Sequence, residues 1–343
     1  GKEGDVVMAG KSGREISITS NKSALGRVLS WEGALVLIFI AVNILGVILS
    51  ENYTAANVLR QMPRYLAEIF ILFPMGYILI LADIDISVGS IVCLSATMAC
   101  FAGNAGLPFP VVILVCLLVG LICGAINGAI LAKFTELPSM IVTLATQIIF
   151  RGIAEVSMGS GGTVSYTNSA DLIPLTTMVG PFPISFFGVV IAAVIFIVVL
   201  SKTTFGRKLY AIGSNKTAAY YAGIKVEKIR FIVFSLAGLM SGFCALVLLS
   251  VLFSANTTTG QGFEMEVIAM AVFGGIATTG GKGNLVGGFI AAFIIVCLRV
   301  ALGLINMNTQ LILVIIGLML IIAVLMPGIS QRIKTMKKMA KQS

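Results

Sequence analysis

The sequence contains no histidine and few charged residues of either sign. Histidine is absent from all 343 residues, and Asp, Glu, Lys and Arg together make up only 11%. Without an imidazole there can be no Ser-His-Asp triad, no histidine-ligated metal and no imidazole proton relay. The six cysteines form no CxxC pair and all lie in apolar stretches, where thiols usually behave as small hydrophobic groups. We therefore expect neither a catalytic centre nor a metal site.

A complete nucleotide-binding motif is also missing. The nearest candidate, residues 275–283, departs from the spacing of a P-loop by one position and has no Ser or Thr after Lys282 to hold Mg²⁺. A tight turn with close helix packing explains these glycines better. We expect that this chain binds no cofactor.

Hydrophobic residues, by contrast, are abundant. They make up 58% of the chain, and the mean hydropathy of +1.06 exceeds what a water-soluble domain with an ordinary polar surface shows. At about 20 residues per membrane-spanning helix, the chain has room for about ten spans. The apolar runs place them near residues 31–50, 64–82, 87–103, 110–132, 138–158, 184–201, 230–253, 265–279, 284–304 and 309–327. The sequence thus predicts an all-α polytopic transmembrane helical bundle. Because the run 265–279 is short and rich in glycine, it could be a broken or re-entrant helix.

Positive charge is concentrated in three polar segments, which define the organisation of the chain. These are an N-terminal tail of residues 1–30, a loop of residues 202–230 and a C-terminal tail of residues 328–343. The transmembrane domain is expected between the tails, over residues 31–327. The positive-inside rule places both tails and the loop in the cytoplasm, which requires an even number of spans. The tail 1–30 has no apolar stretch typical of a cleavable signal peptide.

The loop 202–230 carries seven Lys or Arg residues and one Glu, interrupted by small residues. We expect a short helix of small side chains there, which would dock on a partner protein. Ala219 and Gly223 are four residues apart and would share one face of that helix. The residues assigned to this contact are Gly206, Arg207, Asn215, Ala218, Ala219 and Gly223. The alternative is an ordinary positively charged cytoplasmic loop.

Four segments in a fixed order resemble a known family. They are residues 83–90 (DIDISVGS), the loop 202–230, residues 263–275 (FEMEVIAMAVFGG) and the glycine-rich residues 280–288. With them, the chain resembles the membrane permease subunits of ATP-binding-cassette importers for simple sugars, the group for ribose, xylose, rhamnose and autoinducer-2.

This resemblance implies a transporter subunit rather than an enzyme. The implied partners are a cytoplasmic ATP-binding-cassette ATPase, a second permease subunit in a homodimer or heterodimer, and an extracytoplasmic sugar-binding protein that delivers the solute. The implied location is the bacterial plasma (inner) membrane, as a multi-pass protein in contact with lipid. No nucleic-acid partner is expected, because the positive charge reports orientation in the membrane.

Several neutral polar residues lie inside the predicted spans. Sugars are bound by amides and hydroxyls, and we assign Asn127, Thr143 and Gln147 to the substrate pathway. The alternative is that these groups hold transmembrane helices together. Three glycines at positions 120, 124 and 128 are typical of close helix packing.

Charged residues near the predicted outer ends of the spans have two interpretations. Arg60, Arg64, Glu264 and Glu266 could contact the binding protein, or they could be interfacial side chains that form ion pairs. Arg151 and Glu155 are four residues apart and are expected to pair.

At the inner side, Asp83, Asp85 and Ser87 precede the third span. We expect a carboxylate there to cap the following helix rather than to couple transport.

The competing function is a self-contained, ion-coupled secondary transporter of a small polar solute. Such proteins generally need ionisable groups near the middle of the membrane, whereas the carboxylates here are predicted to gather near the ends of the spans. Dependence of uptake on ATP or on an ion gradient would separate the two functions.

Overall fold

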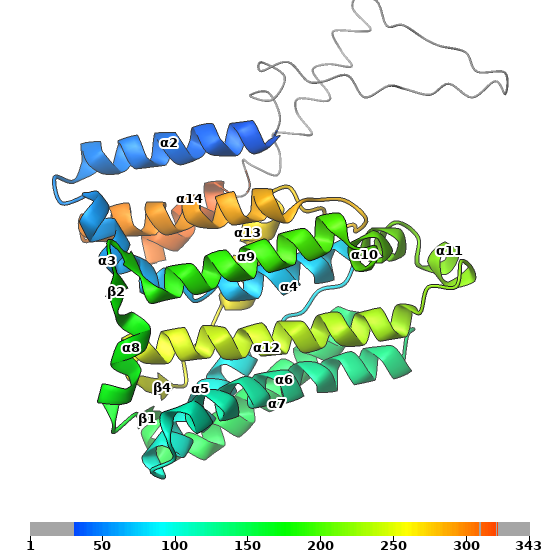
Figure 1. Ribbon diagram of the computed structural model, residues 1–343, viewed down its shortest axis with the longest axis horizontal. Coiled ribbons are helices and arrows are strands. Elements are labelled where there is room, and N and C mark those ends of the chain that lie inside the picture. Colours follow the sequence, from blue (N-terminus) through cyan, green and yellow to red (C-terminus); the bar gives the residue numbers. More distant parts are fainter. Residues whose placement is uncertain (1–30, 309, 320, 322–343) are drawn as a thin grey trace, which may run out of the picture.

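The computed structural model describes residues 31–308, 310–319 and 321. The tails predicted at 1–30 and 328–343, and the end of the last predicted span, lie outside the described residues. The described chain is almost entirely helical, and the long helices run side by side along the longest axis of the molecule (Figure 1).

The helices are α2 (Trp31–Leu49), α3 (Ala55–Leu66), α4 (Ile69–Ile80), α5 (Val88–Asn104), α6 (Phe109–Lys133), α7 (Ser139–Met158), α8 (Ile173–Thr176), α9 (Ile184–Lys202), α10 (Thr204–Ser214), α11 (Lys216–Tyr221), α12 (Val226–Leu252), α13 (Phe263–Phe273) and α14 (Leu285–Leu304). Two short 3₁₀ helices, η1 (Gly159–Gly161) and η2 (Ser169–Leu172), follow α7. The strand β1 (Thr163–Ser165) pairs antiparallel with β4 (Ser254–Asn256), and β2 (Met178–Val179) pairs antiparallel with β3 (Phe182–Pro183). We call the end of the molecule that carries α10 and α11 the α11 end. The opposite end carries β1 and β4, and we call it the β end (Figure 1).

Helices that could cross a membrane account for most of the described chain. Six are long and apolar enough by length and composition, and α3 with α4, bent by 53° at their junction, would make a seventh. Helix α5 and the helix Gln310–Met319 are apolar but shorter. The chain is therefore a polytopic helical membrane protein. The count of ten spans and the sides of the two termini stay predictions.

Two predicted spans differ in shape from the structure. The run 64–82 is the end of α3 followed by α4, with the bend around Glu68. The run 265–279 is helical only as far as Phe273. Gly275 has a φ of +95°, a value that glycine adopts readily, and this turn ends α13. The predicted helix break in this segment thus lies directly after Phe273.

Helices α6 and α12 pack through glycine, as the glycine spacing predicts. A Cβ atom added to Gly124 would lie 2.8 Å from the Cα of Gly238 and would also meet the carbonyl oxygen of Phe234. Gly120 faces Gly238 and Gly242 in the same way. Without side chains at these positions the two backbones can approach closely, which favours packing between membrane helices.

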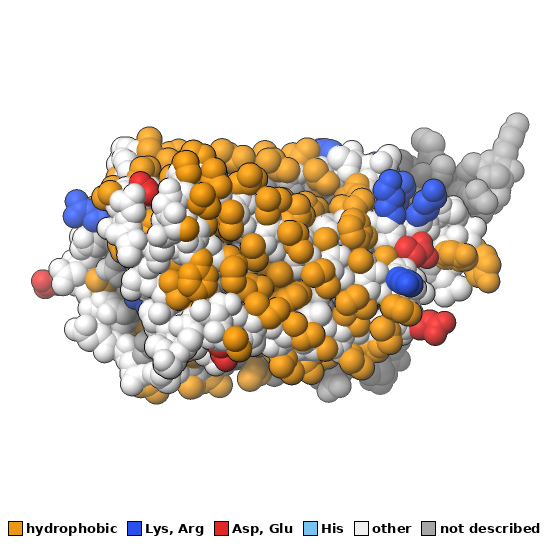
Figure 2. All heavy atoms as spheres, turned by 90° about the horizontal axis from the view of Figure 1, so that it is seen from below, with side chains coloured by type: hydrophobic (Ala, Val, Ile, Leu, Met, Phe, Trp, Pro, Cys, Tyr) orange, Lys and Arg blue, Asp and Glu red, His pale blue; other side chains and the backbone are white. Residues whose placement is uncertain are grey.

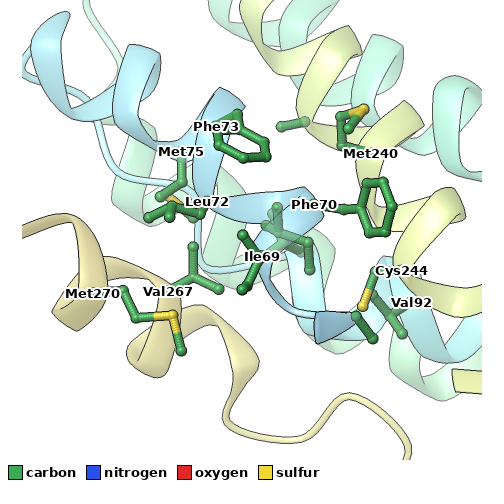
Figure 3. Close-up of a cluster of buried hydrophobic side chains, with 14 of the residues drawn as sticks. Ile69, Phe70, Leu72, Phe73, Met75, Val92, Met240, Cys244, Val267 and Met270 are labelled. Carbon is green, nitrogen blue, oxygen red and sulfur yellow. The ribbon is translucent and has the colours of Figure 1, made fainter. Parts of the chain in front are cut away.

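The surface and the interior of the bundle are both apolar. Hydrophobic side chains cover the middle of the molecule, and most charged side chains in view lie toward the two ends (Figure 2). Inside, apolar side chains of α4, α5, α12 and α13 meet, among them Phe73, Val92, Met240 and Val267 (Figure 3). All six cysteines are buried and free, as expected for thiols that act as small hydrophobic groups.

Candidate functional site

The loop 202–230 folds as two short helices, α10 and α11, whose ends are set by local hydrogen bonds. Thr203 caps α10 by accepting a bond from the Gly206 amide, and the Asn215 side chain caps α11 by accepting a 2.9 Å bond from the Ala218 amide. Gly223 ends α11 with a φ of +81°. The Ile224 amide donates to the Ala219 carbonyl oxygen at 3.0 Å, which completes a Schellman turn.

Two of the residues assigned to docking do not lie as predicted. Ala219 is 4% exposed and faces the rest of the chain, whereas Gly223 is exposed and lies beyond the end of α11. They therefore share no helix face. Gly206 is also buried, since a Cβ there would collide with the backbone of Leu200. Asn215 and Ala218 are exposed on α11, and Arg207 is exposed on α10.

Large side chains, not small ones, form the outermost part of α11. Tyr220 is 60% exposed and Tyr221 is 83% exposed, and their rings contact edge to face with centroids 5.9 Å apart. Arg207 and Lys208 lie exposed on α10. We call Arg207, Lys208, Ala218, Tyr220 and Tyr221 the docking surface. The sequence already contained a signal for an exposed aromatic surface, because Tyr220 and Tyr221 are adjacent in an otherwise basic loop.

Behind the docking surface, α10 packs against two other segments through glycine. The Gly281 amide donates to the Ile80 carbonyl oxygen at 2.8 Å, and a Cβ added to Gly213 would collide with that same oxygen. The Tyr210 hydroxyl donates to the Gly283 carbonyl oxygen at 2.7 Å. The glycine-rich turn 275–283 is therefore a packing element between α4, α10 and α14, as expected.

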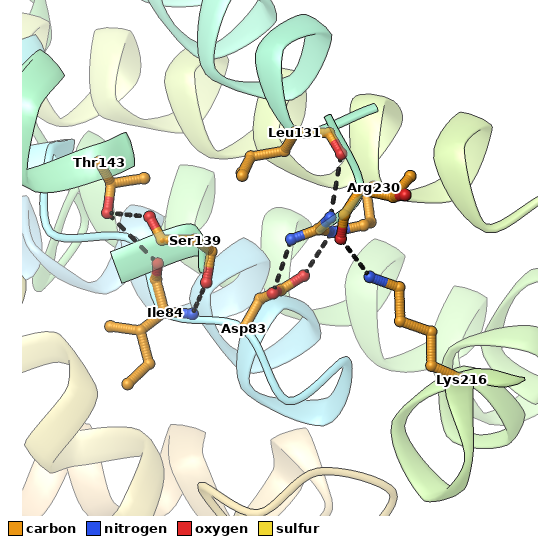
Figure 4. Close-up of polar contacts among 8 residues, drawn as sticks. Asp83, Ile84, Leu131, Ser139, Thr143, Lys216 and Arg230 are labelled. Carbon is orange, nitrogen blue, oxygen red and sulfur yellow. Dashed lines mark hydrogen bonds and ion pairs between the residues drawn. The ribbon is translucent and has the colours of Figure 1, made fainter. Parts of the chain in front are cut away.

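An ion pair links the start of α12 to the segment between α4 and α5 (Figure 4). Arg230 Nε lies 2.8 Å from Asp83 Oδ2, and Nη2 lies 2.9 Å from Oδ1. The third guanidinium nitrogen, Nη1, donates to the Leu131 carbonyl oxygen at 2.9 Å. The side chains of Arg230 and Asp83 are 3% and 14% exposed. Asp83 is thus paired with Arg230 rather than available as a helix cap.

Lys216, the first residue of α11, lies beside this ion pair. Its Nζ donates to the Thr135 carbonyl oxygen at 3.0 Å, in the turn between α6 and α7 (Figure 4). Partial burial, followed by the nearby positive charge of Arg230, lowers the pKa of Lys216. Lys216 and Arg230 both line a cavity of about 330 Å³ at the α11 end. Helix α11 is therefore joined by a hydrogen bond to the turn between α6 and α7, and it lies beside the ion pair of Arg230 on α12.

The neighbouring carboxylate, Asp85, stabilises the turn before α5 and does not cap the helix as predicted, because its bonds go to Ser87, which precedes α5. Its Oδ1 accepts bonds from the Ser87 amide at 2.8 Å and from the Ser87 hydroxyl at 2.6 Å. Asn127 Nδ2 donates to the Ser87 hydroxyl at 2.7 Å, and the Ile86 amide donates to Thr143 Oγ1 at 3.1 Å. Asn127 and Thr143 are fully buried. Two of the three pathway residues are therefore engaged in holding the segment 83–90 against α6 and α7.

The third pathway residue, Gln147, belongs to a polar face of α7. Gln147, Arg151 and Glu155 follow one another at four-residue spacing and line an open cavity of about 490 Å³ with Glu264. Gln147 Nε2 donates to Glu264 Oε1 at 3.3 Å. The predicted pair of Arg151 with Glu155 is wrong within the described residues. Arg151 instead donates to the carbonyl oxygens of Thr257 and Thr259, at 3.0 and 2.8 Å, since both carbonyls of this turn lie within its reach.

The four residues assigned to the binding protein separate into two groups. Arg60 and Arg64 are exposed on α3 at the β end. Glu264 is 7% exposed, and Glu266 forms an ion pair with Arg299 inside the chain. Both glutamates are therefore largely covered by the chain itself.

Arg299 joins two carboxylates that are far apart in the sequence. Its Nη1 donates to Glu68 Oε1 at 3.0 Å, and its Nη2 contacts Glu266 Oε2. Its guanidinium also lies 5.7 Å from the centre of the Tyr65 ring. In the sequence, Arg299, Glu68 and Glu266 appear as isolated charges in apolar runs, and their pairing cannot be predicted from it. Within the described part of the chain, no group of His, Cys, Asp or Glu is arranged to hold a metal ion.

Comparison with known proteins identifies what the chain is similar to. A family model described as "Branched-chain amino acid transport system / permease component" matches residues 63–324. The chain is 33% identical to the ribose import permease protein of Haemophilus influenzae over 306 residues, which cover 88% of this chain and 94% of the relative. It is 32% identical to the D-allose transport system permease protein of Escherichia coli, over 90% of this chain and 95% of the relative. It is 30% identical to an autoinducer 2 import system permease protein of Photorhabdus temperata, over 89% and 93%. No solved structure matches.

Proposed function

Because the chain belongs to the family of transport-system permease components whose model it matches over residues 63–324, we propose that it is the membrane permease subunit of an ATP-driven sugar importer. The observation that carries this proposal is the similarity, over about nine-tenths of the chain, to permeases named for ribose and D-allose. The chain is a permease and not an enzyme. ATP and Mg²⁺ would be bound by a separate ATPase subunit.

Sugar is a better assignment for the solute than a branched-chain amino acid. The family model carries the amino acid name, but the relatives that match about nine-tenths of the chain are named for sugars or for autoinducer 2. A neutral polyol also suits the polar residues available, which are mostly amides, hydroxyls and hydrogen-bonded carboxylates.

The docking surface is the proposed contact for the ATPase, and it would face the cytoplasm. Its aromatic rings are suited to fill pockets on a partner, because exposed Tyr side chains give large contact area at low entropic cost and often dominate binding. Closure of the ATPase pair would move α10 and α11 together. The glycine contacts to α4 and α14, and the ion pair of Arg230 with Asp83, would pass that motion to the membrane helices.

Several further elements of the assembly follow from the same proposal. A second permease subunit, identical or related, would complete the transporter in the bacterial inner membrane, and lipid would cover the apolar belt. Arg60 and Arg64 are the proposed contacts for an extracytoplasmic sugar-binding protein. Asn127 and Thr143 are engaged by their own hydrogen bonds, so the pathway proposal rests on Gln147 and the polar face of α7.

Uptake of a solute panel tests the substrate class. Proteoliposomes that contain the permease, its ATPase and its binding protein are supplied outside with labelled D-ribose, D-allose, autoinducer 2 or leucine. We expect ATP-dependent uptake of one of the first three and none of leucine. Uptake of leucine alone would overturn the sugar assignment.

Labelling of a cysteine tests the orientation. Thr217→Cys on α11 should react with an impermeant thiol reagent only from the cytoplasmic side. Reaction in intact cells would reverse the proposed topology.

A further inference from the structure

A cavity of about 740 Å³ lies at the β end, between α3, α12, α13 and α14. Its rim is exposed and carries Arg64, Gln261 and Asn306, whereas its floor carries the buried Glu68 and Arg299. Arg299 lies five residues before the end of α14, which corresponds to about 7.5 Å of helix. The volume falls within the range of about 300–1,000 Å³ that small-molecule sites usually have.

We propose that this cavity is a binding site for the neutral sugar within the permease itself, at which the sugar rests between delivery and passage through the membrane. The proposal rests on the assignment of the chain as a sugar permease. It adds a ligand site with defined residues to a subunit that would otherwise only form a channel.

Unused hydrogen-bonding groups face the cavity from its floor and its rim. Glu68 is 3% exposed, and its Oε2 atom has no partner among the described residues, although its Oε1 atom is bound by Arg299. A buried carboxylate oxygen without a partner is unfavourable, and a ligand hydroxyl would satisfy it. The side-chain amides of Gln261 and Asn306 form none of the hydrogen bonds found in the described chain. These groups can accept from and donate to the hydroxyls of one polyol.

An aromatic side chain accompanies these polar groups. Tyr65 and Phe263 line the same cavity, and the Tyr65 ring lies 5.7 Å from the Arg299 guanidinium. Aromatic faces bury the apolar face of a ligand, while a few fixed polar groups set its orientation. The residues of this cavity therefore offer both kinds of contact that a sugar ring needs.

The cavity ends in apolar packing toward the middle of the bundle. Directly after Glu68, residues 69–73 of α4 enter the buried cluster of apolar side chains, and Val267 of α13 follows Glu266 into the same cluster (Figure 3). These side chains are tightly packed around Phe73 and Met270. A sugar could therefore enter from the β end and would be stopped above this cluster until the helices move.

Equilibrium binding to the permease and ATPase in nanodiscs, without the binding protein, tests the site. The probes are labelled D-ribose and D-allose at millimolar concentration. We expect saturable binding of the sugar that the assembled importer takes up. Loss of one rim hydrogen bond in Gln261→Ala or Asn306→Gly should weaken this binding about two- to tenfold. Glycine is chosen at position 306 because Asn306 has a φ of +55°.

A matched control and a stability measurement separate a ligand site from a structural role. Gln61→Ala removes an exposed amide from α3 that does not line the cavity, and it should bind sugar like the wild type. Gln261 and Asn306 are exposed, so their variants should keep the thermal midpoint of the wild type while they lose affinity for the sugar. A loss of affinity that follows a loss of stability would overturn the ligand site.

Failure of this inference can be told apart from failure of the proposed function. If the wild-type permease shows no saturable sugar binding while the complete importer still takes up sugar with ATP, the proposed sugar site is wrong and the proposed function stands. Equal binding by the rim variants, the control and the wild type would do the same. Absence of ATP-dependent sugar uptake by the complete assembly would overturn the proposed function.

Discussion

The ion pair between Arg230 and Asp83 offers a direct test of how the docking helix acts on the membrane helices. The pair is bidentate, and the Arg230 side chain is 3% exposed. Removal of one partner from a buried pair destabilises a protein by about 3–5 kcal/mol, because the other charge is left buried without compensation. Asp83 borders the cavity at the α11 end, so water can reach the vacated site. We therefore expect Asp83→Asn to destabilise the permease by about 3 kcal/mol.

The double variant Asp83→Asn with Arg230→Met measures the coupling between the two side chains. Since it removes both charges, it should recover most of the stability that the single variant loses, with a coupling energy of about 2 kcal/mol. Lys228→Met is the control, because Lys228 is an exposed cation on the same helix that forms no ion pair in the described chain. Thermal unfolding of the purified permease gives the stabilities.

The same variants report on coupling in the reconstituted importer. Asp83→Asn should bind the ATPase and hydrolyse ATP, but it should import less sugar per ATP than the wild type, because movement of α11 is no longer transmitted through Arg230 to the segment between α4 and α5. Unchanged stability together with an unchanged ratio of uptake to ATP hydrolysis would refute this reasoning.

Further variants test three other elements. Tyr220→Ala and Tyr221→Ala should each weaken ATPase binding about 30-fold, equivalent to about 2 kcal/mol at an aromatic hot spot, without loss of folded permease; co-purification at unchanged ATPase yield would contradict the docking surface. Gly124→Ala should destabilise the permease by about 1–3 kcal/mol because the new methyl group meets the backbone of Phe234 and Gly238. The control Gly152→Ala, with nothing within 4 Å of its Cβ, should be neutral or stabilising by up to about 1 kcal/mol. Similar thermal midpoints for the two variants would refute the packing argument. Arg64→Glu should reduce stimulation of ATP hydrolysis by the binding protein, most strongly at low salt because exposed charges are screened, and an effect that does not depend on salt would argue against a charge contact.

Much of the fold could be predicted from the sequence, because apolar runs of the length of a membrane are a strong signal. The glycines at positions 120 and 124 predicted close packing of one helix against another, which the structure shows to be α6 against α12. The basic loop 202–230 predicted a short helix outside the apolar belt. Positions within that loop were harder to assign. Small residues were expected at the partner contact, but Ala219 is small because α11 packs against the chain there, and Gly223 is glycine because its φ is positive.

Contacts between distant residues could not be predicted from a single sequence. Arg299 and Glu68 are 231 residues apart, and Arg230 and Asp83 are 147 apart. Each appears in the sequence as one charge in or beside an apolar run, and many partners satisfy the same spacing rules. Arg151 illustrates the same difficulty, because a nearby Glu155 offered a local partner while carbonyl oxygens of a remote turn were geometrically better placed.

The energy source of uptake tests the central claim most directly. Proteoliposomes with the permease, the ATPase and the binding protein are prepared in two ways. One set is loaded with ATP and Mg²⁺, and the other contains neither but carries an imposed proton or sodium gradient. The importer assignment predicts sugar uptake only with internal ATP, and only when all three proteins are present. Uptake by the permease alone, driven by an ion gradient without ATP, would contradict the assignment and would favour an ion-coupled secondary transporter.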